Sequence, residues 1–269
     1  LEDKETKDNS PKANMRKVMR IFAKTPVALA AFYRSRKGKK IIPPKKNLSF
    51  AENFFYMCFG KVPNKDIVKA FDVSLILYAE HSFNVSTFTA RTITSSLSDI
   101  HGAITGAIAS LKGPLHGGAN EEVMHMMNKI KKPENAFKWI NKALDKKEVV
   151  MGFGHRVYKK GDSRVPTMEK YFKKVSKIQK DKKFIKIYDV VKSVMIERKN
   201  IHPNVDYPTG PTYHLMGFDT DFFTPIFVIS RITGWSAHIM EQHAANKLIR
   251  PLSKYSGPDH RKVVLLNQR

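Results

Sequence analysis

Cysteine is almost absent, because Cys58 is the only one among 269 residues. An internal disulfide is therefore impossible, which fits a reducing compartment. No stretch reaches the ~20 consecutive apolar residues that a membrane-spanning helix requires, so we predict no membrane insertion. The sequence also lacks a Gly-x-Ser-x-Gly elbow, a Walker phosphate loop and a His-Glu-x-x-His pair. These absences argue against a serine hydrolase, a P-loop nucleotidase and a zinc peptidase.

Acidic residues are also few, with 24 Asp and Glu against 48 Lys and Arg and a net charge of +24. A strongly basic chain suggests nucleic-acid binding. Only 12 of the basic residues are arginines, however, and the lysines are dispersed along the chain as doublets and triplets. We interpret this excess as a solvated surface and predict no nucleic-acid partner. Such a surface would still attract substrates that carry carboxylates or phosphates.

Helical periodicity extends over nearly the whole chain, and no strand alternation persists. The expected helices cover 11–34 (with a kink or break before Pro26), 49–59, 65–81, 86–111, 121–127, 134–144, 165–179, 184–198, 224–245 and a short helical tail. The stretch 86–111 is rich in small residues, which predicts a closely packed helix pair in the core or, alternatively, at a subunit interface. The sequence therefore predicts an all-α protein.

Three loops rich in glycine or proline interrupt these helices, at 112–120, 151–164 and 202–210. Loops on a rigid scaffold are common places for catalytic residues. In the first loop, His116 lies just before an expected helix start, where the helix dipole disfavours a protonated imidazole. A neutral His116 could donate a hydrogen bond to a developing oxyanion, but a histidine that caps the helix explains the pattern equally well.

The other two loops contain His155 and Asp206. His155 follows two glycines and precedes a cationic stretch in which Lys159 could meet phosphates. Asp206 lies among apolar residues and prolines, where it could be a buried base, although a turn-forming aspartate is the commoner case. The ten histidines are dispersed, and the nearest pair, His238 and His243, does not stack on one helix face. We therefore predict no metal site.

Three motifs occur in order along the chain: Gly-Pro-Leu-His-Gly-Gly-Ala-Asn at 113–120, Gly-Phe-Gly-His-Arg-Val-Tyr-Lys at 152–159 and Pro-Asn-Val-Asp at 203–206. Together with the segments around 78–88 and 223–242, they resemble the citrate synthase family. The resemblance implies the citrate synthase fold, with a large helical domain (1–117 and 218–269), a smaller one (118–217) and the active site in the cleft between them. Family members have a longer N-terminal portion, so we expect an N-terminally truncated chain.

The family condenses an acyl-CoA with oxaloacetate. By resemblance, Asp206 is the base, His116 stabilises the enolate and His155 polarises the ketone. The residues implied to hold oxaloacetate are His81, Arg164, Arg231 and Arg250, the last reaching the partner's site in a homodimer. The residues implied to lie near coenzyme A are Gly152, Gly154 and Lys159. Coenzyme A arrives as the thioester substrate, and the resemblance implies no permanently bound cofactor.

Some sequence details favour the 2-methylcitrate synthase branch: Tyr-Pro-Thr-Gly at 207–210, His-Ser-Phe-Asn at 81–84 and the tail around 246–258. We therefore predict condensation of propionyl-CoA, and also of acetyl-CoA, because one methylene discriminates by only ~1–3 kcal/mol. The alternatives are a citrate synthase specific for acetyl-CoA and a non-catalytic basic paralogue. Either a bacterial cytoplasm or a mitochondrial matrix suits such an enzyme.

Overall fold

The computed structural model describes residues 3–155, 157–158, 161–259 and 261–269. Every regular element among them is a helix, and the one isolated bridge joins Phe153 to Pro203. The expected all-α class is therefore confirmed. The α-helices are α1 (Pro11–Ser35), α2 (Phe50–Phe59), α3 (Lys65–Tyr78), α4 (Val85–Ser95), α5 (Ile100–Leu111), α6 (Ala119–Ile130), α7 (Pro133–Asp145), α8 (Val165–Ile178), α9 (Lys183–Lys199), α10 (Asp206–Leu215) and α11 (Phe223–Ala244). Short 3-10 helices cover Thr220–Phe222 and Leu266–Gln268.

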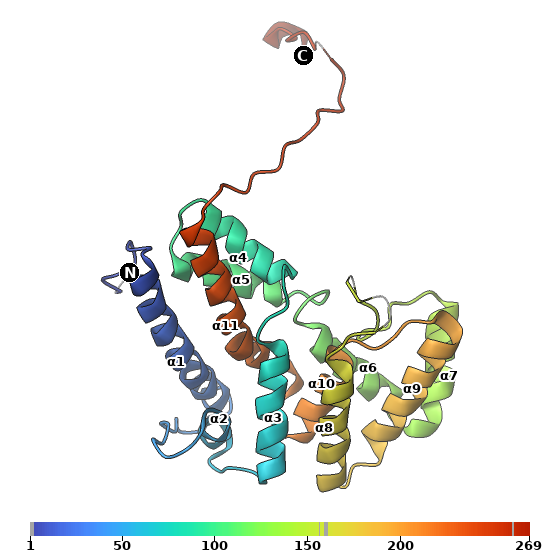
Figure 1. Cartoon of the computed structure of the whole chain (residues 1–269). Coiled ribbons are helices and arrows are strands. Elements are labelled where there is room, and N and C mark those ends of the chain that lie inside the picture. The colour runs from blue at the N-terminus through green and yellow to red at the C-terminus, as the bar shows by residue number, and fades with distance from the viewer. Residues whose placement is uncertain (1–2, 156, 159–160, 260) are drawn as a thin grey trace.

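Figure 1 shows α1, α2, α4, α5 and α11 on one side of the molecule and α7 and α9 on the other, with α3, α8 and α10 between them. The residues after α11 extend away from the helices as a tail. The expectation of a helical tail is thus wrong, because only its last short 3-10 helix is regular. Within the described ranges, no helix is both long and apolar enough to cross a membrane.

Local capping signals explain where several helices begin. Ser10 accepts a hydrogen bond from the Ala13 amide at the start of α1, and Ser49 with Glu52 forms a complete capping box at the start of α2. Such caps satisfy amides that have no partner inside the helix. A kink or a break was expected before Pro26, and the break is excluded, because α1 continues through this residue without interruption.

The expected loop at 202–210 is also wrong in its second half, because α10 begins at Asp206. Pro208 occupies the first turn of α10, where a helix needs no amide donor, so proline is tolerated there. Gly210 lies where a Cβ would approach the Asn120 carbonyl oxygen to 2.7 Å. The proline and the glycine therefore permit a helix that packs closely on α6, although their local preference indicates a loop.

The core consists of two clusters. The first is rich in aromatic rings and joins α1, α2 and α3 to the helices α6 to α10 and to the start of α11. In it, Phe71 stacks on Phe54, with centroids 5.5 Å apart, and contacts Tyr213 of α10. The second cluster surrounds Trp235 of α11 and includes small alanines of α4 and α5. The closely packed pair expected in 86–111 is therefore present as α4 and α5.

One glycine determines how closely α3 and α11 approach each other. The Gly234 amide donates to the Ala79 carbonyl oxygen at 3.1 Å, and a Cβ on Gly234 would lie only 2.4 Å from that oxygen. Real Cβ atoms do not approach a backbone oxygen so closely, so the two helices would have to separate. Gly234 therefore keeps Arg231 of α11 beside the end of α3 and His81.

We predict that Gly234→Ala lowers the free energy of unfolding by about 1–3 kcal/mol, because the added methyl group overpacks a rigid backbone contact. Urea denaturation measures the change. Gly102→Ala is the matched control, since its Cβ would meet only side-chain atoms, the Ser98 hydroxyl at 3.1 Å and Asp99 Oδ1 at 3.9 Å. The control should be neutral or stabilising by up to about 1 kcal/mol. Equal destabilisation of both variants would contradict the prediction.

Candidate active site

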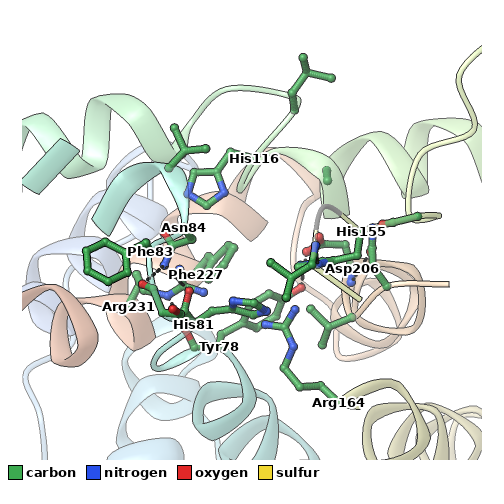
Figure 2. A pocket seen from close by; sticks show the side chains of 18 residues that line it. Tyr78, His81, Phe83, Asn84, His116, His155, Arg164, Asp206, Phe227 and Arg231 are labelled. Atoms are coloured by element: carbon green, nitrogen blue, oxygen red, sulfur yellow. Dashed lines mark hydrogen bonds between the residues drawn. The ribbon is translucent and has the colours of Figure 1, made fainter. Parts of the chain in front are cut away.

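The three sequence motifs meet around one cavity of about 390 Å³ (Figure 2). Its walls come from the end of α3, the segment before α4, the loops that precede α6 and α8, the start of α10, and α11. The predicted site residues among its lining are His81, His116, Gly154, His155, Arg164, Asp206 and Arg231. The structure therefore brings together residues that are spread over most of the sequence.

Backbone hydrogen bonds hold the second loop against the third. The Gly154 amide donates to the His202 carbonyl at 2.9 Å, and the Asn204 amide donates to the Gly152 carbonyl at 2.9 Å. The Asn204 side chain adds a bond to the Gly154 carbonyl at 3.0 Å. Gly152 has φ +85°, and a Cβ there would lie 2.6 Å from Val123. This pairing places His155 and Asp206 at the same cavity.

Asp206 is the first residue of α10, and its carboxyl group lies beside the cavity. The Tyr78 hydroxyl donates to Asp206 Oδ1 at 2.5 Å. Burial raises the pKa of Asp206 to about 6, although the Tyr78 hydrogen bond and the charge of Arg164 oppose this shift. A carboxyl group with this pKa is mostly ionised at neutral pH, and it is a stronger base than an exposed aspartate.

His116 is fixed in one neutral form by Ser86. The Ser86 amide donates to His116 Nε2 at 3.2 Å, and the Ser86 hydroxyl oxygen lies 2.8 Å from the same nitrogen. The Trp235 indole donates to that hydroxyl at 3.0 Å. A backbone amide can only donate, so Nε2 has no proton and Nδ1 carries it. Burial, helped by the charge of Arg231, lowers the pKa of His116 to about 4, so the ring is neutral at pH 7.

His155 has the opposite tautomer. Its Nδ1 accepts from the amides of Val157 at 3.0 Å and Tyr158 at 3.2 Å, so the ring proton lies on Nε2. Burial and the neighbouring His81 lower the pKa of His155. The rings of His81 and His155 lie 4.9 Å apart. Both histidines that the sequence identified as catalytic candidates are therefore neutral N–H donors.

Arg231 is a buried cation with 2 % of its surface exposed. Its Nε donates to the Tyr78 carbonyl at 2.6 Å, and its guanidinium carbon lies 4.7 Å from the centre of the Phe227 ring. Burial lowers its pKa to about 10. Within the described part of the chain, Arg231 forms no ion pair, and Nη1 of Arg231 and Nε2 of His81 have no hydrogen-bond partner. A buried, unpaired cation beside a cavity is suited to an anionic ligand.

Arg164, in contrast, is paired with Asp162. Its Nε and Nη2 reach the two carboxylate oxygens of Asp162 at 2.9 and 2.7 Å, and the Val205 amide donates to Asp162 Oδ2 at 3.0 Å. Burial raises the pKa of Asp162, but the hydrogen bonds from Arg164 lower it below its usual value. Asp162 therefore holds Arg164 at the cavity and joins it to the start of α10.

The comparisons with known proteins agree with this geometry. A family profile described as "Citrate synthase, C-terminal domain" matches residues 1–252. The chain is 53 % identical to the citrate synthase of Mycolicibacterium smegmatis and 55 % identical to 2-methylcitrate synthase 2 of Corynebacterium glutamicum, over 98 % and 93 % of its own length. The chain belongs to the citrate synthase family.

The fold also matches that of a solved structure of the family. The ternary complex of Thermoplasma acidophilum citrate synthase with carboxymethyl coenzyme A and oxaloacetate superposes with a TM-score of 0.88 at 34 % identity, over 96 % of this chain and 70 % of that one. The chain spans 70 % and 66 % of the length of the two relatives from M. smegmatis and C. glutamicum. The expected citrate synthase fold is therefore confirmed.

Of the predicted residues that the structure describes, Gly152 and Arg250 do not line the cavity. Arg250 is exposed in the tail and is not part of the lining. Lys159 lies outside the described residues. Four residues of the site were not identified from the sequence. Tyr78, Ser86 and Asp162 form hydrogen bonds with Asp206, His116 and Arg164, respectively, and the Trp235 indole donates to the Ser86 hydroxyl. Only Asp162 left a local signal, an acidic residue two positions before Arg164 in a basic loop.

We predict that nitrogen-15 NMR at pH 7 finds both site histidines neutral but in opposite tautomers, with the proton on Nδ1 of His116 and on Nε2 of His155. The backbone amides that donate to the other nitrogens enforce this difference. The two rings serve as controls for each other, because they share the cavity. A proton on Nε2 of His116 would contradict the hydrogen bond from the Ser86 amide.

Proposed function

We propose that the protein condenses propionyl-CoA, and also acetyl-CoA, with oxaloacetate and releases coenzyme A together with 2-methylcitrate or citrate. One observation carries this proposal: the carboxylate of Asp206 faces the same cavity as two neutral imidazoles with defined N–H donors. Such a set can remove a proton from carbon and stabilise two carbonyl oxygens at once. No metal is needed for this chemistry.

The first step removes a proton from the carbon next to the thioester. This proton is only weakly acidic, so its removal requires a well-placed base and stabilisation of the enolate oxygen. Asp206 takes the proton, and the Nδ1–H of His116 donates to the enolate oxygen. A neutral His116 suits this role, because its pKa of about 4 leaves it uncharged before and during the transfer.

The second step forms the carbon–carbon bond. Arg231, Arg164 and His81 bind the two carboxylates of oxaloacetate, with Arg231 supplying the buried unpaired charge. The Nε2–H of His155 donates to the ketone oxygen, which makes the ketone carbon a better electrophile for the enolate. Water then hydrolyses the thioester of the condensed intermediate, so that coenzyme A leaves as the free thiol.

Several features of the complete enzyme belong to the same proposal. Residues 118–217 form a small domain that closes on the large one and excludes water. Two copies form a homodimer in which Arg250 of the exposed tail reaches the partner's oxaloacetate. Gly152, Gly154 and Lys159 lie along the coenzyme A path. The ternary complex of the T. acidophilum relative, with both kinds of ligand bound, supports the assignment of the two substrates.

Acetyl-CoA alone is the second candidate for the acyl donor. The relative from M. smegmatis is named citrate synthase, whereas the relative from C. glutamicum is named 2-methylcitrate synthase. A protein of Bacillus subtilis at 41 % identity is named citrate/2-methylcitrate synthase, which supports a proposal that includes both acyl groups. The ratio of the rates with propionyl-CoA and acetyl-CoA decides between the candidates.

We predict that full-length protein mixed with oxaloacetate and either acyl-CoA releases free thiol, which Ellman's reagent measures. Asp206→Asn should lower turnover by about 10²- to 10⁴-fold, because a general base contributes this much. Wild-type turnover should fall as the pH drops through about 6, where Asp206 becomes protonated. Absence of thiol with both acyl-CoA substrates would refute the proposal.

We also predict that Arg231→Met raises the KM for oxaloacetate at least about tenfold, since a charged hydrogen bond to the substrate is lost. Oxaloacetate should also protect this variant less against thermal unfolding than it protects the wild type. Arg198→Met is the control, because Arg198 pairs with Asp145 on the surface of α7 and α9. An unchanged KM in Arg231→Met would exclude Arg231 from substrate binding.

A further inference from the structure

Tyr78 contacts the proposed base directly, and three other contacts fix its own position. Its hydroxyl donates to Asp206 Oδ1 at 2.5 Å, and only 1 % of the residue is exposed. Its ring centre lies 4.0 Å from that of Phe227, and its carbonyl accepts from Arg231 Nε. The end of α3 is held against α11 by the Gly234 contact. The phenol therefore has little freedom to leave the carboxylate.

We propose that Tyr78 is the positioning residue of the base: its hydroxyl occupies Oδ1 of Asp206, keeps the carboxylate ionised, and leaves Oδ2 as the oxygen that takes the substrate proton. This inference rests on the proposed role of Asp206. It assigns the two oxygens different tasks, which the presence of a carboxylate in the cavity does not do by itself.

The phenol remains the donor throughout the working pH range. Burial and the charge of Asp206 raise the pKa of Tyr78 well above its ordinary value, so the tyrosine keeps its proton while Asp206 is ionised. A donor of this kind favours the charged form of a carboxyl group and opposes the effect of burial. It also restricts rotation of the carboxylate, which keeps Oδ2 in a constant direction.

Other charged and titratable groups around Asp206 come from several elements. Arg164, at the start of α8, and Arg231, on α11, lower the pKa of Asp206, whereas the charge of Asp162 raises it. Burial, with a smaller effect of the charge of Asp206, raises the pKa of Tyr213 further along α10, but the Tyr213 hydroxyl pairs with Ser74 Oγ at 3.0 Å. Among the described residues, Tyr78 is the only side chain with a hydrogen bond to the carboxylate of Asp206.

The test is the pH dependence of kcat/KM in full-length Tyr78→Phe. Loss of the donor should move the acid limb upward from about pH 6 by one pH unit or more. The loss of activity relative to the wild type should therefore be at least about fivefold at pH 6 and shrink above pH 8. A loss that is equal at all pH values, with an unmoved limb, would mean that Tyr78 is only structural and would overturn the inference.

Tyr213→Phe is the matched control, because it removes the same atom from another buried tyrosine near Asp206. It should leave the acid limb unmoved. If Tyr78→Phe does not fold, 3-fluorotyrosine placed at position 78 keeps the hydroxyl and makes it a stronger donor. The acid limb should then move to lower pH, and an unmoved limb would again overturn the inference.

A measurement without turnover separates this inference from the proposed function. Carbon-13 NMR of aspartate-labelled protein reports the titration of Asp206 directly, and Asp206→Asn identifies its signal. A pKa that rises in Tyr78→Phe supports the contact even if no acyl-CoA is turned over, in which case only the proposed function fails. An unchanged pKa in a folded variant overturns the inference while the proposed function stands.

Discussion

The buried carboxylate of Asp162 holds together three segments that line the cavity. It accepts three hydrogen bonds from Arg164 and one from the Val205 amide, with only 3 % of the residue exposed. Breaking a buried pair of this kind typically costs 3–5 kcal/mol, because an uncompensated charge is left inside. The pair joins the loop of His155 to the start of α8 and the start of α10. The positions of Arg164 and Asp206 therefore depend on one side chain.

The charged groups beside the cavity are not evenly paired. The carboxylate of Asp206 is stabilised by the Tyr78 hydroxyl and by two nearby guanidinium groups. Arg231, in contrast, has no carboxylate partner among the residues that the structure describes. Two histidines that line the cavity, His116 and His155, are neutral because burial and nearby cationic groups oppose protonation. A dianionic substrate would complete this arrangement. The free protein thus maintains an unfavourable buried charge that a bound anion would relieve, a common property of preorganised sites.

Short stretches of sequence predicted helices correctly where the structure depends mainly on interactions between neighbouring residues. The helix expected over 49–59 is present as α2, which Ser49 caps, and the small residues of 86–111 indicated a closely packed helix pair. The same local rules failed at Pro26 and at 206–210, because neighbouring helices supply packing that outweighs the preference of proline and glycine for loops. Gly210 is an example: a glycine is needed at this position because α6 packs closely against it, and not because the chain must be flexible there.

The sequence by itself determined the all-α class, the family resemblance and the identity of the cavity residues His116, His155 and Asp206. These features depend on periodicity, motif order and residue type. Only the tertiary structure decided which nitrogen of each histidine carries the proton and which oxygen of Asp206 is occupied. The reason is that the deciding partners are distant in sequence or belong to the backbone: Tyr78 lies 128 positions from Asp206, and the Ser86 amide lies 30 positions from His116.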